Sequence, residues 1–251
     1  MDYAKIIEYI SKKIPNGVVL NRQDLLDKSM EINPLFQETL LRNLLEKLLK
    51  EGVLVRVGRN QYKKYNGSVN KEIYKSQYSK EAQFLVEIME REYPLLDYRV
   101  WELNWLNEFW NHQIAQNKIF LEVERIGCNF VYTGISDKYS GRILLTPNEK
   151  ELYRYGGPDT VIIDRLISEA PKGSPEHYNA PLEKVIVDLF ANKNLRSMVH
   201  IGEYAEAVTE MFNKYIIDQT KLFRYANRRN KKKEIYHFLK EEAGIEVTAE
   251  V

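Results

Sequence analysis

The stretch from residue 33 to residue 65 constrains the fold more than any other part of the chain. Leucines at positions 41, 44, 45 and 48 lie on one face of a helix that runs towards Gly52, a residue typical of the position just after a helix end. Two short segments, residues 53–57 and 61–65, then alternate around the tight turn at residues 58–60. The pattern predicts a helix followed by a two-stranded hairpin.

Two shorter helices are predicted upstream. Isoleucines at positions 6, 7, 10 and 14 recur at helical spacing, so a first helix is expected over residues 3–13. After a short extended segment at residues 18–20, Asn21 is expected to cap a second helix over residues 22–28, with Asp24 in its first turn. Pro34 suits the first position of the third helix. Three short helices, an edge strand and a hairpin are typical of a winged helix-turn-helix, whose third helix lies in the DNA major groove.

The DNA contacts are expected on the polar face of the third helix and on the hairpin. The basic side chains that would contact phosphate or groove are Arg42, Arg56, Arg59, Lys63 and Lys64. The polar side chains that could read base edges are Gln37, Thr39 and Asn43, and Asn60 lies at the wing tip. In the alternative interpretation, this unit mediates protein contacts and its basic residues lie on a solvated face.

The charge distribution points to polyanions, although the whole chain carries only +1. Residues 1–66 hold 12 basic and 8 acidic residues, a net +4. Residues 221–233 hold seven basic residues and no acid, so the remainder of the chain carries −10. Two basic regions on an acidic body indicate one or two contacts with polyanions.

The rest of the chain predicts a second domain. Residues 1–66 form the winged helix-turn-helix, residues 67–80 a polar linker, and residues 81–251 a mixed α/β domain with a helical C-terminal part, so the fold class is α+β. Helices are expected over 82–91, 104–116, 181–191, 201–215 and 219–242; strands are expected over 95–101, 119–124, 129–133 and 142–145. Residues 159–169 hold a further apolar run. The absence of long apolar runs and the single cysteine, Cys128, predict a cytoplasmic protein without a transmembrane helix or an internal disulfide.

Catalytic motifs are scarce in this sequence. The four histidines lie far apart in the chain, with no acid or cysteine at ligand spacing, and neither a phosphate-binding loop nor a nucleophile motif occurs. Asp97 with Glu122 and Glu124 is similar to the metal-binding core of restriction-type nucleases, which normally have a lysine where Glu124 stands. We therefore expect no enzyme, no cofactor and no metal. The alternative is a metal-dependent restriction-type nuclease with a winged-helix DNA-specificity domain, and a degenerate nuclease-like fold also remains open.

Two C-terminal segments carry a resemblance to a known family. They are APLEKVIVDLF at residues 180–190 and DQTKLFRYANRRN at residues 218–230. Together with the hairpin sequence LVRVGRNQY, they resemble the AbiEi-type antitoxins of type IV toxin–antitoxin systems, although Asn60 stands where that family's wing commonly has glycine. The resemblance implies an antitoxin that represses its own operon, with double-stranded operator DNA and a co-encoded nucleotidyltransferase-like toxin as partners and no membrane.

The same two segments can also be interpreted from their residues alone. The first is an apolar helix that leaves Glu183, Lys184 and Asp188 on its polar side; the second is a helix capped by Asp218. The basic residues expected to form the antitoxin surface are Arg224, Arg228, Arg229, Lys231, Lys232 and Lys233. The alternatives are a solvated basic face and, for the whole chain, a plain protein-interaction adaptor.

Overall fold

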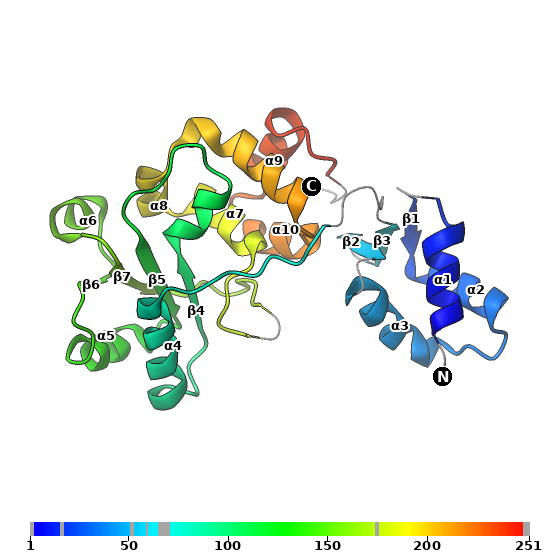
Figure 1. The fold of residues 1–251 in the computed structure, drawn as a ribbon, viewed down its shortest axis with the longest axis horizontal. Helices are drawn as coiled ribbons and strands as arrows, with labels where there is room; N and C mark the ends of the chain where they lie inside the picture. Colours follow the sequence, from blue (N-terminus) through cyan, green and yellow to red (C-terminus); the bar gives the residue numbers. More distant parts are fainter. Residues whose placement is uncertain are drawn as a thin grey trace.

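The computed structural model describes residues 3–15, 18–50, 53–58, 60–64, 71–173 and 176–247 (Figure 1). The side chains of Lys50 and of residues 55–58 are outside this description. The predictions made for Gly52, for Arg59 and for residues 65–70 therefore fall outside the described residues. None of the helices within the described ranges has both the length and the apolar character that crossing a bilayer requires.

The N-terminal part consists of three helices and a small antiparallel sheet. Its elements are α1 (Ala4–Lys13), β1 (Val19–Asn21), α2 (Arg22–Ile32), α3 (Glu38–Lys50), β2 (Leu54–Gly58) and β3 (Gln61–Lys64). Strand β3 lies between β1 and β2 and pairs antiparallel with both. The buried apolar side chains form a cluster drawn only from residues 6–62, and it includes the predicted isoleucine and leucine stripes of α1 and α3.

Local signals fixed the start of α2 but not the start of α3. Asn21 accepts a hydrogen bond from the backbone N–H of Asp24, whose carboxylate accepts one from Asn21, so the predicted cap is confirmed as a full capping box. The prediction that the third helix begins at Pro34 was wrong. The side chain of Asn33 accepts from the backbone N–H of Leu35, and its carbonyl accepts from Phe36, so residues 33–36 form a turn before α3.

The second part is built on a four-stranded mixed sheet. Its strands are β4 (Tyr98–Glu102), β5 (Lys118–Val123), β6 (Ile143–Leu145) and β7 (Thr160–Arg165), in the order β4-β5-β7-β6. Strand β4 is antiparallel to β5, whereas β5, β7 and β6 run parallel. The fold is therefore mixed α+β, with a helical C-terminal part.

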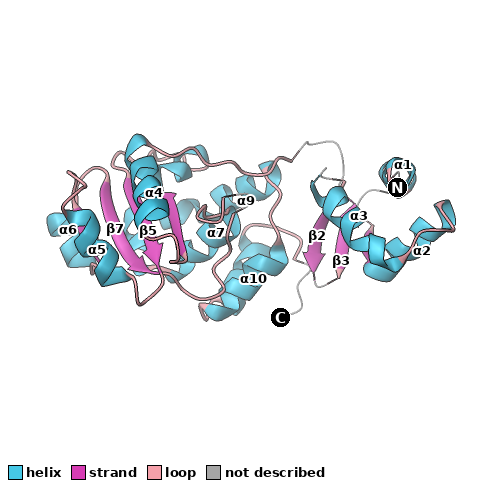
Figure 2. Ribbon diagram, turned by 90° about the horizontal axis from the view of Figure 1, so that it is seen from below, coloured by secondary structure: helices cyan, strands magenta, loops and turns pink. Residues whose placement is uncertain are grey.

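Helices cover both faces of this sheet (Figure 2). One face packs against α4 (Lys80–Glu92) and α5 (Cys128–Ser136) through the side chains of Ile119, Leu121 and Val123 on β5. The other face carries Phe120 and packs against α7 (Leu182–Ala191), α9 (Tyr204–Lys214) and α10 (Gln219–Arg228). The remaining elements are the 3₁₀ helices η1 (Leu103–Glu108) and η2 (Ile201–Glu203), the helices α6 (Glu149–Tyr155), α8 (Lys193–Met198) and α11 (Lys232–His237), and the π-helical turn η3 (Phe238–Glu242).

Three predicted elements are wrong. The expected strand at 129–133 is helix α5, whose buried residues Cys128, Val131 and Ile135 recur at helical spacing. The expected helix at 104–116 is the short η1 and a loop, which the side chain of Asn107 closes by bonding the backbone N–H and C=O of Ile114. The expected long helix over 219–242 is interrupted after α10, where Asn230 has a φ of 56°.

The N-terminal sheet lies beside the C-terminal helices. Strand β2 lies against α10 (Figure 1). The ammonium of Lys63 on β3 pairs with the carboxylate of Glu246 near the C-terminus. The backbone carbonyl of Glu246 accepts a hydrogen bond from the side chain of Gln219 at the start of α10. Glu72 forms a further backbone bridge with Tyr215, the residue that follows α9.

Candidate functional site

Helix α3 presents a polar face to solvent. Leu41, Leu44, Leu45 and Leu48 are buried, and this packing turns the opposite side of the helix outward. The candidate base-reading and phosphate-contacting residues on or next to this helix are all exposed: Gln37, Thr39, Arg42 and Asn43. Arg42 pairs with Glu46 one turn later, with 3.1 Å between Nε and Oε1, and its side chain remains 80% exposed. The four residues therefore share one accessible surface.

The hairpin contributes fewer candidate contacts than the sequence predicted. Asn60 lies at the tip with a φ of 57° and is exposed, which fits its predicted place in the turn. The side chain of Arg56 and all of Arg59 are outside the described residues. Lys63 pairs with Glu246, so its ammonium faces the C-terminal segment.

Lys64 has a structural role in place of the predicted DNA contact. Its side chain is buried, and its ammonium donates to the backbone carbonyls of Ser11 and Ile14, each at 2.5 Å. These carbonyls lie at the C-terminal end of α1, where they lack partners within the helix and where a cation is favoured by the helix dipole. A buried ammonium in this position does not reach phosphate.

The basic segment at the end of α10 divides into exposed and buried members. Arg224 pairs with Glu169 at 3.4 Å, and Nε of Arg228 donates to the hydroxyl of Ser168 at 2.5 Å. Both side chains are exposed, as is that of Lys233; Lys231 pairs with Glu234, and Lys232 is half-buried. Arg229 differs, because its guanidinium turns inward to Asp188 at 2.7 Å and its side chain is only 17% exposed. The predicted antitoxin surface therefore loses Arg229.

Arg229 belongs to a buried charge cluster, which we define as Glu122, Lys184, Asp188, Tyr225 and Arg229. The ammonium of Lys184 lies 2.5 Å from carboxylate oxygens of both Glu122 and Asp188. The hydroxyl of Tyr225 donates to Asp188 at 3.0 Å and accepts from Arg229 at 2.9 Å. The cluster joins β5, α7 and α10, so the two segments that carry the family resemblance meet in the interior.

The prediction that Glu183, Lys184 and Asp188 lie on a polar side of their helix was wrong, because all three are buried. Every residue of α7 from Leu182 to Phe190 is buried, because the sheet lies on one side of the helix and α10 on another. The spacing of Lys184 and Asp188, four residues apart, is the signal that could have revealed an ion pair within this apolar helix.

Burial and mutual attraction shift the pKa values of the cluster. Burial raises the pKa of Glu122, although Lys184 beside it acts in the opposite direction. Burial alone would lower the pKa of Lys184, but the carboxylates of Asp188 and Glu122 outweigh it and raise the pKa above its ordinary value. Lys184 therefore stays charged between its two acids, and its positive charge offsets the cost of burying them.

The three acids considered as a nuclease centre do not come together. Asp97 pairs with Arg99 at 2.6 Å, and its backbone N–H donates to Glu124 at 2.7 Å, whereas Glu122 points into the charge cluster. Across the described ranges, no group of three or more His, Cys, Asp or Glu side chains is arranged to hold a metal ion. Cys128 is buried, and burial raises its pKa, which disfavours the reactive thiolate form.

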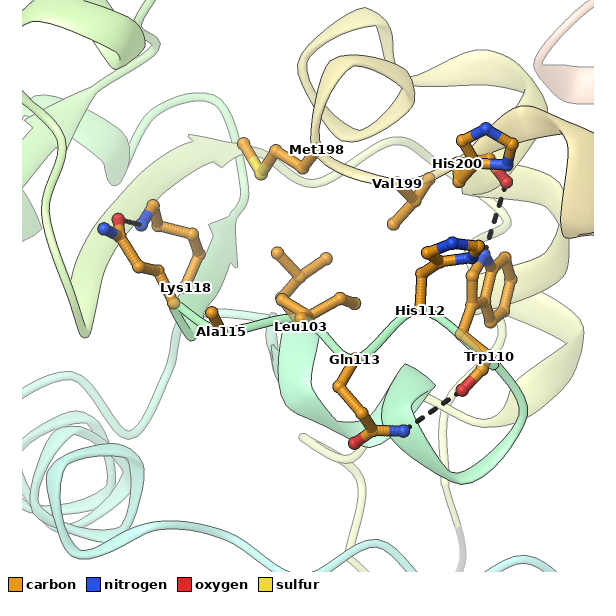
Figure 3. Close-up of a pocket in the computed structure, with 11 residues that line it drawn as sticks. Leu103, Trp110, His112, Gln113, Ala115, Lys118, Met198, Val199 and His200 are labelled. Atoms are coloured by element: carbon orange, nitrogen blue, oxygen red, sulfur yellow. Dashed lines mark hydrogen bonds between the residues drawn. The ribbon is translucent and has the colours of Figure 1, made fainter.

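The structure brings together two histidines that lie far apart in the sequence, His112 and His200. The rings of His112 and His200 lie 5.4 Å apart, and both approach Glu203. They line one end of a pocket of about 390 Å³, whose other end is formed by Lys118 and whose middle is apolar (Figure 3). Burial alone would raise the pKa of Glu203, but His112 and the backbone amides of Asn111 and His112 lower it.

Comparisons with known proteins identify a family but not a function. The model of a family described as "Family of unknown function (DUF6577)" matches residues 40–244, so the chain belongs to this family. A search of the curated proteins finds no match. Among solved structures, the chain is similar to the RV2827C protein from Mycobacterium tuberculosis, with 12% identity, a TM-score of 0.38, and coverage of 97% of this chain and 77% of that chain.

Proposed function

We propose that this member of the DUF6577 family is a transcriptional repressor whose N-terminal winged helix-turn-helix binds operator DNA. The observation that carries the proposal is the order α1-β1-α2-α3-β2-β3 with β3 between β1 and β2, combined with an α3 whose polar face is exposed. In a winged helix, this helix enters the major groove and the hairpin lies along the adjacent backbone.

The side chains on α3 fit the two tasks of such a helix. Asn43 and Gln37 can donate and accept at base edges in the major groove, and Arg42 can contact a phosphate or a guanine. The ion pair of Arg42 with Glu46 is exposed on both sides, so it contributes at most about 1 kcal/mol and yields readily to a phosphate. The net charge of +4 on residues 1–66 favours the approach to DNA.

The experiment measures binding of the purified protein to the DNA upstream of its own gene, by fluorescence anisotropy at several salt concentrations. Arg42→Ala should reduce the slope of log K against log salt by about 0.9, the contribution of one phosphate contact. Asn43→Ala should cost about 1–3 kcal/mol on the preferred sequence and little on unrelated DNA. Lys5→Ala, which removes an exposed charge from α1, is the matched control. Wild-type behaviour of both α3 variants would refute the assignment of α3.

A role as an antitoxin is the second part of the proposal, and it rests on the resemblance of residues 180–190 and 218–230 to the AbiEi-type antitoxins. In this role the protein counteracts a co-encoded nucleotidyltransferase-like toxin in the cytoplasm and is not itself an enzyme. The exposed basic side chains of Arg224, Arg228 and Lys233 support a surface that docks on an acidic partner. The buried positions of Lys184, Asp188 and Tyr225 indicate that these motif residues act by joining α7 to α10.

A further inference from the structure

A second pocket lies at the carboxyl ends of two parallel strands of the large sheet. It has a volume of about 360 Å³ and is lined by Glu122 on β5, Asp164 and Arg165 on β7, the turn of residues 191–194 between α7 and α8, and Arg229 after α10. Parallel α/β sheets bind their ligands at this edge, because the loops that follow the strands open a crevice there. The pocket has no part in the proposed DNA contact.

Arg229 is a pre-oriented cation in the wall of this pocket. Its Nη1 donates to Asp188 and to the hydroxyl of Tyr225, which fixes the plane of the guanidinium. Among the described residues, no further hydrogen bond occupies Nε or Nη2, so these donors remain for a ligand. A guanidinium held in this way matches the oxygens of a phosphate with little loss of side-chain entropy.

Two more cations stand at the rim. Arg165 and Lys193 are exposed, and in the described part of the chain neither forms a side-chain ion pair. They belong to different elements, β7 and α8, and both line the pocket. Together with Arg229, they give the pocket lining three basic side chains from three separate segments.

The negative charge of the acidic side chains in the pocket is balanced by neighbouring basic side chains. Glu122 and Asp164 are register partners on β5 and β7, and they point to the same face of the sheet. Lys184 pairs with Glu122. Within the part of the chain that the structure describes, Asp164 accepts one hydrogen bond, from the backbone N–H of Arg165 at 2.7 Å. Burial raises the pKa of Asp164, although the backbone N–H of Arg165 and the guanidinium of Arg229 act in the opposite direction. When Lys184 and Asp188, which lie behind the pocket wall, are included, the site holds four basic side chains and three acidic ones.

We propose that this pocket binds a phosphate monoester, with Arg229, Arg165 and Lys193 as the groups that contact its oxygens. A free nucleotide and a 5′-phosphorylated nucleic-acid end share this chemistry, and both are substrates that a regulator of a nucleotide-handling toxin would encounter. The site is independent of the proposed winged helix, because its lining residues all lie between residues 122 and 229.

The test is isothermal titration of the full chain at low salt with four probes: AMP, adenosine, and a single-stranded thymidine hexamer with either a 5′-phosphate or a 5′-hydroxyl. We expect AMP or the phosphorylated hexamer to bind, and the matched compound without the phosphate to bind at least about tenfold more weakly. Binding of AMP identifies a free nucleotide as the ligand, whereas binding of the phosphorylated hexamer alone identifies a nucleic-acid end.

Variants locate the binding. Arg165→Gln/Lys193→Gln should weaken it about tenfold, because two charge-assisted hydrogen bonds are lost. Lys80→Gln/Arg91→Gln removes the same charge from α4 on the opposite face of the sheet and should leave binding unchanged. Asp164→Asn removes a negative charge beside the ligand and should strengthen binding severalfold.

Equal binding of phosphorylated and unphosphorylated probes, or equal weakening by the two double variants, would overturn the proposal. Because none of these substitutions touches the N-terminal part, operator binding should persist in all three variants. Failure of the phosphate site is thereby distinguishable from failure of the proposed repressor function.

Discussion

The ammonium of Lys184 on α7 lies 2.5 Å from a carboxylate oxygen of Glu122 on β5, although 62 positions separate the two residues in the chain. Lys184 is fully buried, and the same ammonium also contacts Asp188. This arrangement places a charged link between the central sheet and the helical C-terminal part, at the point where the two resemblance segments meet.

Lys184→Met should lower the free energy of unfolding by about 3–5 kcal/mol, because it leaves the buried carboxylate of Glu122 without its cation and that of Asp188 with Arg229 alone. Urea denaturation followed by circular dichroism gives the value, with Lys150→Met on the exposed face of α6 as the control. Adding Glu122→Gln to Lys184→Met should recover part of the loss, since one unpaired charge is removed. A loss below about 1 kcal/mol would contradict this account of the cluster.

The pH dependence of stability should depend in part on Glu183. Burial raises its pKa above the ordinary value of 4.5, although the backbone N–H of Asp218 donates to its carboxylate at 2.8 Å. The folded state therefore holds this proton more tightly than the unfolded state does. The resulting stabilisation is complete below pH 4.5 and is lost as the pH rises through the raised pKa.

Glu183→Gln tests this assignment, because the amide keeps an acceptor for Asp218 and cannot ionise. The unfolding free energy of the variant relative to wild type should increase between pH 4.5 and pH 8. The measurement is a series of urea titrations across this range. A difference that stays constant or decreases with pH would show that Glu183 is not the group responsible.

Substitution of Lys64 should affect the stability of the protein, whereas substitution of the hairpin arginines should affect DNA binding. Lys64→Met should destabilise the protein by about 1–3 kcal/mol, because it removes the donor to two buried carbonyls at the end of α1. It should leave the salt dependence of operator binding unchanged. Arg56→Ala/Arg59→Ala should instead flatten the log–log slope by about two units. The hairpin assignment is wrong if this double variant binds like wild type at every salt concentration.

The nuclease interpretation predicts cleavage that we do not expect. Asp97 and Glu124 are tied to Arg99 and to the Asp97 backbone, and Glu122 is tied to Lys184. Incubation of plasmid DNA and of RNA with the protein and Mg²⁺ or Mn²⁺ should give no cutting above the level of a Glu122→Gln preparation. Metal-dependent cutting that Glu122→Gln abolishes would restore the nuclease as the better hypothesis.

Repression and toxin neutralisation should depend on different surfaces of the protein, so substitutions on one surface should leave the other function unchanged. Arg224→Glu/Arg228→Glu/Lys233→Glu reverses exposed charges and should abolish rescue of cells from the co-encoded toxin while a promoter reporter stays repressed. Arg42→Ala/Asn43→Ala should do the opposite. Arg229 is left intact in this design, because replacing it would strip Asp188 of a buried partner and confound loss of function with unfolding. Rescue by a folded triple variant would show that the basic surface is not required.

The sequence by itself determined the elements whose signals lie within a few residues of one another. The capping box of Asn21 and Asp24, the cap by Asp218 and the leucine face of α3 are all set by local spacing, and all are present in the structure. The hairpin of β2 and β3, strand β5 and helix α7 are local in the same sense. The start of α3 and the break at Asn230 were missed because single side chains and one backbone conformation decide them.

Only the tertiary structure decided which polar residues are buried and what they meet. Lysine is usually a surface residue, yet Lys64 and Lys184 are both buried. A backbone carbonyl at the end of α1 accepts a hydrogen bond from Lys64, and a carboxylate of the central sheet accepts one from Lys184. Both acceptors come from distant parts of the chain. His112 and His200 acquire a common carboxylate in the same way. A charged side chain is stable in the protein interior when the fold places a hydrogen-bonding or oppositely charged partner beside it. The periodicity of one helix does not predict which side chains the neighbouring segments place there.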